Sequence, residues 1–252
     1  MITALAFGLY FLIDELFFQS WYQSLRELTG FPALSFGVAY LAVGLPILLA
    51  AFWLFRKDWL TGLGLNQSLL KGAGLALLFT LPMLIGYAIV FPLNQELSFQ
   101  KIMIGAVFAG FFEELYFRGG LFGFIFRYTK VGFIPAILIG ALLFASVHLY
   151  QSQDPSVLVG IFLTTFMGAI LFAWTFIEWE ENLWVPIFLH LFMNFFWMLF
   201  SAGENALGGT YANVFRLMTI AAVIIGTISW KRKQKLPLAI NRHSLMWKKE
   251  AE

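Results

Sequence analysis

Three charged side chains interrupt an apolar stretch that is long enough to cross a membrane. Glu113, Glu114 and Arg118 lie within the run from Ile102 to Phe126. A charge at the centre of a membrane-spanning helix costs at least about 2.5 kcal/mol, so three together indicate a function. On a helix Glu114 and Arg118 are one turn apart and can pair, whereas Glu113 is rotated by about 100° and has no partner in its own helix. We therefore expect Arg118 to hold Glu114 and Glu113 to remain free to react.

Two of the three histidines and an asparagine lie in other apolar segments. His148 follows Phe144 by four residues, and Asn194 follows His190 by four, so each pair shares one helical face. Polar side chains inside a membrane turn toward one another or toward water. We therefore expect the segments to enclose one polar chamber. Interhelical hydrogen bonding explains a single histidine or asparagine, but it does not require a second, unpaired glutamate.

These residue types suit the hydrolysis of a peptide bond. A glutamate can take a proton from water as the water attacks a carbonyl. A histidine can orient that water or bind a metal, and an asparagine can donate to the developing oxyanion. Two histidines and a carboxylate, here His148, His190 and Glu113, also supply the three protein ligands of an open zinc site. Direct activation of water by glutamate and metal-assisted attack both remain open.

The composition predicts a membrane protein with several spans. Of 252 residues, 60% are hydrophobic and only 12% are charged, roughly half the charged fraction of about 25% in soluble domains. The net charge of +2 gives no indication of a nucleic-acid partner. The absence of cysteine excludes disulfides and thiolate metal sites.

Segments of about 20 apolar residues predict an all-α fold of about eight transmembrane helices. We expect a single membrane domain over residues 1–252, with a catalytic core at about 102–200 and a basic cytoplasmic tail at 231–252. The first segment contains Asp14 and Glu15, which would lie near an interface if this segment spans the membrane; the alternative is a half-inserted helix. The eight expected segments are 2–19, 31–55, 72–93, 102–126, 133–150, 157–177, 183–200 and 212–230.

The distribution of basic residues predicts the orientation. With eight spans, most loop lysines and arginines fall on one side together with the tail, so both termini are expected in the cytoplasm of a multi-pass cell-membrane protein. The acidic turn from Glu178 to Glu181 falls on the same side and is expected to be solvated. The lysine-rich tail is expected to fix the topology and is also suited to contact anionic lipid.

The three polar groups also form an ordered set of motifs. Glu113 to Arg118 reads EExxxR, Phe144 to His148 reads FxxxH, and His190 to Asn194 reads HxxxN. In this order, on separate segments, they resemble the motifs of the CAAX-protease and bacteriocin-processing family (CPBP, or Abi) of intramembrane proteases, which includes the type II CAAX prenyl endopeptidases. The resemblance covers about residues 102–200.

The resemblance implies an eight-helix fold around an intramembrane polar chamber. By motif, Glu113 resembles the water-activating carboxylate and His148 its partner. His190 and Asn194 resemble the pair that stabilises the oxyanion or completes a metal site, and Glu114 and Arg118 match supporting positions. Members have been described both as metalloproteases and as metal-independent glutamate proteases, so a divalent metal such as zinc and a metal-free site are both compatible with it.

The expected activity is therefore that of an intramembrane endopeptidase. Its expected partners are a peptide or membrane-protein substrate and the lipid bilayer, with no nucleic acid. One alternative is a catalytically silent family member that acts as an immunity or scaffold protein. The other is a transporter or proton relay, because buried acids, histidines and arginines also mark ion pathways.

Overall fold

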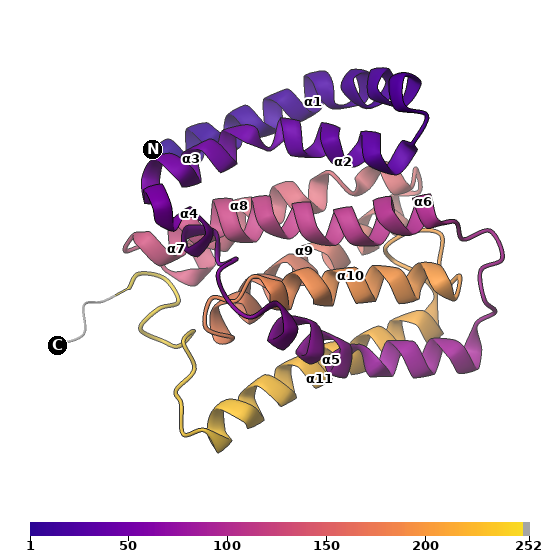
Figure 1. The fold of residues 1–252 in the computed structure, drawn as a ribbon. Helices are drawn as coiled ribbons and strands as arrows, with labels where there is room; N and C mark the ends of the chain where they lie inside the picture. Colours follow the sequence, from indigo (N-terminus) through magenta and orange to yellow (C-terminus); the bar gives the residue numbers. More distant parts are fainter. Residues whose placement is uncertain (249–252) are drawn as a thin grey trace.

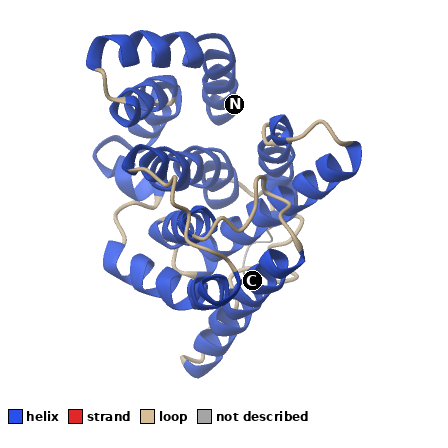
Figure 2. Ribbon diagram, turned by 90° about the vertical axis from the view of Figure 1, so that its right-hand side faces the viewer, coloured by secondary structure: helices blue, strands red, loops and turns tan. Residues whose placement is uncertain are grey.

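The structure, a computed structural model, describes residues 1–248 and consists of helices joined by short connections. Within this range there is no named strand, and the ribbon consists of helices joined by loops (Figure 2). The expected all-α fold is thereby confirmed. The main helices are α1 (Ile2–Thr29), α2 (Pro32–Val43), α3 (Leu45–Phe55), α4 (Trp59–Leu63), α5 (Leu69–Val90), α6 (Phe99–Ile102), η2 (Met103–Phe122), α7 (Gly123–Tyr128), α8 (Phe133–Ser146), α9 (Pro155–Glu178), α10 (Trp184–Leu199) and α11 (Thr210–Lys233), with short 3₁₀ turns η1 (Arg56–Asp58) and η3 (Leu149–Gln151).

The described residues contain five helices that are long and apolar enough to cross a membrane, and six if the bent pair α2 and α3 counts as one span. These are α1, α5, α8 with its extension to Gln151, α9 and α11. The other two expected spans are the polar rod α6–η2–α7 and the shorter helix α10. The protein is thus a multi-pass membrane protein, and eight spans is an approximate count.

The first span differs from the sequence expectation. Helix α1 continues past residue 19 to Thr29 and ends at Gly30, which takes the left-handed conformation (φ 70°) that suits glycine. Asp14 and Glu15 consequently lie at the middle of this helix and not near its end. Glutamate is a good helix former and aspartate a tolerable one, so two acids alone do not end a helix.

The polar rod lies at the centre of the bundle. Helices α6, η2 and α7 follow one another without a break, and η2 packs against α1, α2, α3, α8, α9 and α10. In Figure 1, α1 to α3 lie on one side of this rod and α5 and α11 on the other. The η2 section has the hydrogen bonding of a π-helix, a form that is rare and occurs frequently at functional sites.

Tyr116 of the rod packs at the bend between α2 and α3. A β-carbon at Gly44 would lie 2.0 Å from the Tyr116 ring, so only glycine leaves room there. The Tyr116 hydroxyl donates to the carbonyl of Tyr40 at 2.9 Å, beside the bend. The pair α2 and α3 is bent by 50° at this point.

The prediction that the acidic turn after α9 is solvated is wrong in part. The turn is not simply solvated, because Glu178 is fully buried and pairs with Lys231 at 2.7 Å. Glu180 pairs with Lys71 at 2.6 Å and Glu181 with Arg127 at 2.5 Å. Three acidic side chains therefore join α9 to α5, α7 and α11 at one end of the bundle.

The basic residues gather at that same end, as expected. The N-terminus and the segment after α11 lie at the same, left-hand end of the bundle in Figure 1, the N-terminus above and the segment after α11 below. The segment 234–248, part of the expected tail, is not solvated throughout but folds back along the helix ends. Residues 249–252 of that tail lie outside the described residues. Which side of the membrane this end faces remains a prediction.

Candidate active site

The two adjacent glutamates of the rod have different surroundings. The Glu114 side chain is fully buried, while that of Glu113 is 18% exposed. Glu114 Oε1 contacts both Arg118 and His190, whereas Glu113 Oε2 has no hydrogen-bond partner among the described residues. The predicted pairing of Glu114 with Arg118 is confirmed. Glu113 Oε2 lies 3.9 Å from His190 Nε2, and its role as the reacting carboxylate remains a prediction.

Glu114 is held by a cation from its own helix and a histidine from another. Arg118 Nη1 lies 3.2 Å from Glu114 Oε1, which confirms the i, i+4 pairing. His190 Nδ1 lies 2.8 Å from the same oxygen. The carboxylate accepts, so His190 donates from Nδ1 and turns Nε2 toward Glu113, whose Oε2 is 3.9 Å away. Glu114 therefore orients His190 toward the free carboxylate.

Arg118 is buried and incompletely satisfied. Its guanidinium lies 4.3 Å from the centre of the Phe144 ring and 5.7 Å from that of Phe172. Although Nη1 is near Glu114, its N–H does not point at the carboxylate, and the three guanidinium nitrogens have no aligned hydrogen bond among residues 1–248. The two aromatic faces supply cation–π attraction in place of hydrogen bonds. Such a group is costly in a low-dielectric interior, and a supporting role for Arg118 at the site remains a prediction.

His148 lies beyond the end of its helix. Helix α8 ends at Ser146, and His148 falls in the following turn, partly buried. Its Nδ1 lies 2.6 Å from the carbonyl oxygen of Phe144, which can only accept, so Nδ1 carries the proton and Nε2 is free. Its ring packs 4.5 Å from that of Phe144. No described hydrogen bond or ion pair joins His148 to Glu113, so the structure does not bring this expected pair together.

Asn194 lies on the same helix as His190 and is partly buried. Its Nδ2 donates to the carbonyl oxygen of Gly105 in η2 at 2.9 Å. One of its two N–H groups is therefore used to fix α10 against the rod, and the other is available to an acceptor. An oxyanion role for Asn194 remains a prediction.

Close packing of two backbones places His190 at the rod. A β-carbon at Gly110 would lie 2.9 Å from the backbone nitrogen of Leu191, so glycine allows α10 to approach η2 at this level. Phe172 of α9 stacks on the His190 ring, with centroids 5.4 Å apart. Neither Gly110 nor Phe172 belongs to a motif, and their contribution was not evident from the sequence.

The expected metal ligands are not assembled. Among the described residues, no group of three histidine, aspartate or glutamate side chains lies close enough to hold a metal ion. His190 and His148 each use Nδ1 for a protein acceptor, as metal-binding histidines do, but Glu113, His148 and His190 do not form a ready-made ligand set. The arrangement present, a free carboxylate beside an oriented imidazole, is suited to proton transfer and to holding a water molecule.

Part of the chain is similar to a known protein family. Residues 95–196 match the family model described as "type II CAAX prenyl endopeptidase Rce1-like". The match includes all three motifs and begins and ends close to the expected core. Neither the search of curated proteins nor that of solved structures found a match.

Proposed function

From the Rce1-like family match over residues 95–196, which implies protease activity in a membrane, we propose that the protein is an intramembrane endopeptidase with Glu113 as its general base. The observation that carries the proposal is the difference between the two glutamates: Glu114 Oε1 contacts both Arg118 and His190, whereas Glu113 Oε2 has no hydrogen-bond partner among residues 1–248 and only His190 Nε2 within 3.9 Å. A general base has to keep a lone pair available for the proton it removes.

In the proposed step, water is held between Glu113 Oε2 and His190 Nε2, which are 3.9 Å apart. Glu113 takes one proton from this water while the water oxygen attacks the carbonyl carbon of the substrate. The protonated Glu113 then gives that proton to the departing amine. This sequence breaks one C–N bond, forms one C–O bond and returns Glu113 to the carboxylate.

The other motif residues support this step. Glu114, with Arg118 beside it, keeps the His190 ring in one tautomer and orientation, because the buried carboxylate accepts from Nδ1. The free N–H of Asn194 is our candidate donor to the oxyanion. His148 is our candidate for a second contact to the water or the carbonyl. Phe144 packs against both Arg118 and His148 and so supports each of them.

A metal-assisted version uses Glu113, His148 and His190 as ligands and would supply a Lewis acid for the carbonyl. It needs these three side chains to come closer together than they lie among the described residues. We therefore base the steps above on the protein's own groups. In either version the substrate is a peptide or a membrane-protein segment that reaches the rod from the bilayer, and both termini are proposed to be cytoplasmic.

Comparative peptidomics of cells tests the proposal. Cells with the wild-type protein are compared with cells carrying Glu113→Gln, and Glu15→Gln serves as the control because Glu15 is an exposed glutamate of α1. We expect a set of cleavage products that is present with the wild type and the control and absent with Glu113→Gln. An identical set of products in all three strains would contradict the proposal.

A further inference from the structure

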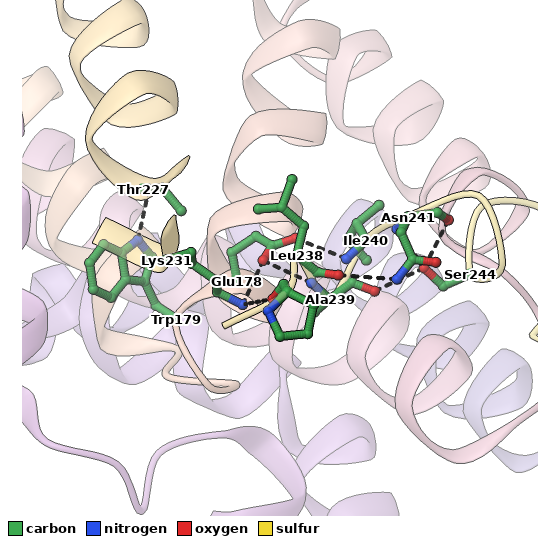
Figure 3. A network of polar contacts seen from close by, with 10 residues as sticks. Glu178, Trp179, Thr227, Lys231, Leu238, Ala239, Ile240, Asn241 and Ser244 are labelled. Carbon is green, nitrogen blue, oxygen red and sulfur yellow. Dashed lines mark hydrogen bonds and ion pairs between the residues drawn. The ribbon is translucent and has the colours of Figure 1, made fainter. Parts of the chain in front are cut away.

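The segment after α11 is bound along one end of the bundle. We call residues 234–248 the strap. Glu178, the last residue of α9, accepts the backbone N–H of Ala239 at 3.0 Å and that of Ile240 at 2.9 Å. Lys231 Nζ lies 2.7 Å from the same carboxylate (Figure 3). A fully buried carboxylate thus receives two backbone donors from the strap and one cation from α11.

The far end of the strap is bound to the start of α8. The backbone N–H groups of Gly132, Phe133 and Ile134 donate to the carbonyls of Met246, Ser244 and Leu245 at 3.0, 2.8 and 2.9 Å. The first N–H groups of a helix have no partner within the helix, and α8 has no side-chain cap. The strap therefore caps α8 with its own backbone.

One short turn joins these two attachments. The Ser244 hydroxyl donates to the carbonyl of Ala239 at 2.9 Å and accepts from the backbone N–H of Asn241 at 2.9 Å (Figure 3). The Ile240 side chain packs against the main hydrophobic core. Because the turn is stiffened in this way, the bond to Glu178 and the cap on α8 are held at a fixed separation.

Helix α8 connects the strap to the active site. Phe144 on its last turns packs 4.3 Å from the Arg118 guanidinium, and the Phe144 carbonyl binds His148. A shift of α8 along its axis would therefore move both Phe144 and His148 relative to the rod. The strap acts on the opposite end of the same helix.

We propose that Glu178 is a positioning residue: it docks the strap, the strap fixes the axial position of α8, and α8 places Phe144 and His148 at the site. The effect on turnover rests on the proposed protease function. Docking of the strap by Glu178 does not depend on the proposed protease function and can be measured separately.

The first experiment compares Glu178→Ala with Glu180→Ala in the purified protein. Glu180 lies two residues further on and is exposed, and its side chain pairs with Lys71. We expect Glu178→Ala to lower kcat by about 10- to 100-fold with little change in KM, since a misplacement of about 1 Å can cost that much. Glu180→Ala should keep the wild-type kcat. Equal kcat values for the two variants would overturn the proposal.

The second experiment locks the strap in place. Val131 and Trp247 form an antiparallel bridge pair, at a spacing that a disulfide can cover. The chain contains no cysteine, so Val131→Cys with Trp247→Cys gives a single defined pair. Oxidation of this pair should be about tenfold slower in Glu178→Ala than in Glu180→Ala, and this readout needs no proteolysis.

Rescue by the lock distinguishes positioning from a general loss of folding. In the Glu178→Ala protein, oxidation of the cysteine pair should restore kcat to within about threefold of the wild type, and reduction should remove the gain. A fully oxidised protein with no recovery of kcat would overturn the positioning role. Equal oxidation rates in the two variants would overturn the docking role, whether or not the protein proves to be a protease.

Discussion

Two clusters of acidic side chains, one in the rod and one in the turn after α9, satisfy their charges differently. In the turn, Glu178, Glu180 and Glu181 each have a basic partner, and Glu178 also accepts two backbone N–H groups. In the rod, Glu113 Oε2 and the Arg118 nitrogens have no aligned partner among the described residues. Buried polar groups are normally satisfied, so the turn has the features of a structural joint and the rod those of a reactive site.

The two clusters also differ in backbone conformation. Glu180 and Glu181 have φ values of 63° and 58°, a left-handed region that is unfavourable for residues other than glycine. Their ion pairs and the burial of Glu178 hold the turn in this shape. The rod residues lie in continuous helix and have no positive φ value, so the rod lacks the left-handed residues of the turn.

The largest effect on stability is expected from removing the buried cation of the rod. Arg118→Met leaves the buried Glu114 without its cation, and breaking a buried pair in this way costs about 3–5 kcal/mol. Adding Glu114→Gln should recover part of the loss, because the uncompensated charge is then removed. Equilibrium unfolding in detergent measures both variants. A loss below about 1 kcal/mol for Arg118→Met would show that the rod does not depend on this pair.

A smaller loss is expected at the turn. Lys231→Met removes the cation from Glu178 but leaves the two backbone N–H groups of Ala239 and Ile240 bound to it. We expect a loss of about 1–3 kcal/mol, the range for one buried hydrogen-bond partner. Lys233→Met, at an exposed position in the same helix, is the control and should unfold like the wild type. Equal stabilities for the two variants would mean that Glu178 does not need Lys231.

A still smaller loss of stability is expected at the ion pair between Glu181 and Arg127. Glu181→Gln removes an ion pair with Arg127, but Arg127 keeps its hydrogen bonds to the carbonyls of Gly62 and Thr61. We expect at most about 1 kcal/mol, decreasing as salt is added because exposed charges are screened. Unfolding at low and high salt measures this. A loss as large as that of Lys231→Met would contradict the ranking.

The smallest effect on stability is expected for a carboxylate outside both clusters. Asp154 caps α9, and hydrogen bonds from the Ser156 hydroxyl and from the backbone N–H groups of Ser156 and Val157 hold its pKa below its usual value near 3.8. A lowered pKa adds stability above the unfolded value, which is lost as the pH falls through the folded pKa. Asp154→Asn keeps a capping side chain but removes this dependence on pH. The thermal midpoints of the two proteins should therefore differ slightly at pH 6 and converge at pH 3.

Periodicity and motif spacing predicted much of the rod. A helical repeat determines that Glu114 and Arg118 meet and that Glu113 does not, and the structure confirms this. The apolar segments likewise predicted the helices, because membrane spans have to be long and apolar. The predicted end of the first segment at residue 19 was wrong, because an acidic residue is not a helix stop signal.

Contacts between distant segments could not be predicted. Glu178 is buried because Ala239 and Ile240 reach it from 61 and 62 residues away, and no local pattern marks such a partner. The end of α8 at Ser146 leaves His148 in a turn, and helix ends are the least reliable part of a sequence prediction. The role of Gly110 depends on which helix packs against it.

The most direct test of the account is the turnover number and unfolding midpoint of purified Glu113→Gln, measured with a substrate found by peptidomics. The account predicts a loss of about 10²–10⁴-fold in kcat, the usual contribution of a general base. It also predicts an unfolding midpoint at or above that of the wild type, because Glu113 Oε2 has no hydrogen bond to lose among residues 1–248. A kcat within threefold of the wild type, in a protein that is folded, would contradict the assignment of Glu113 as the base.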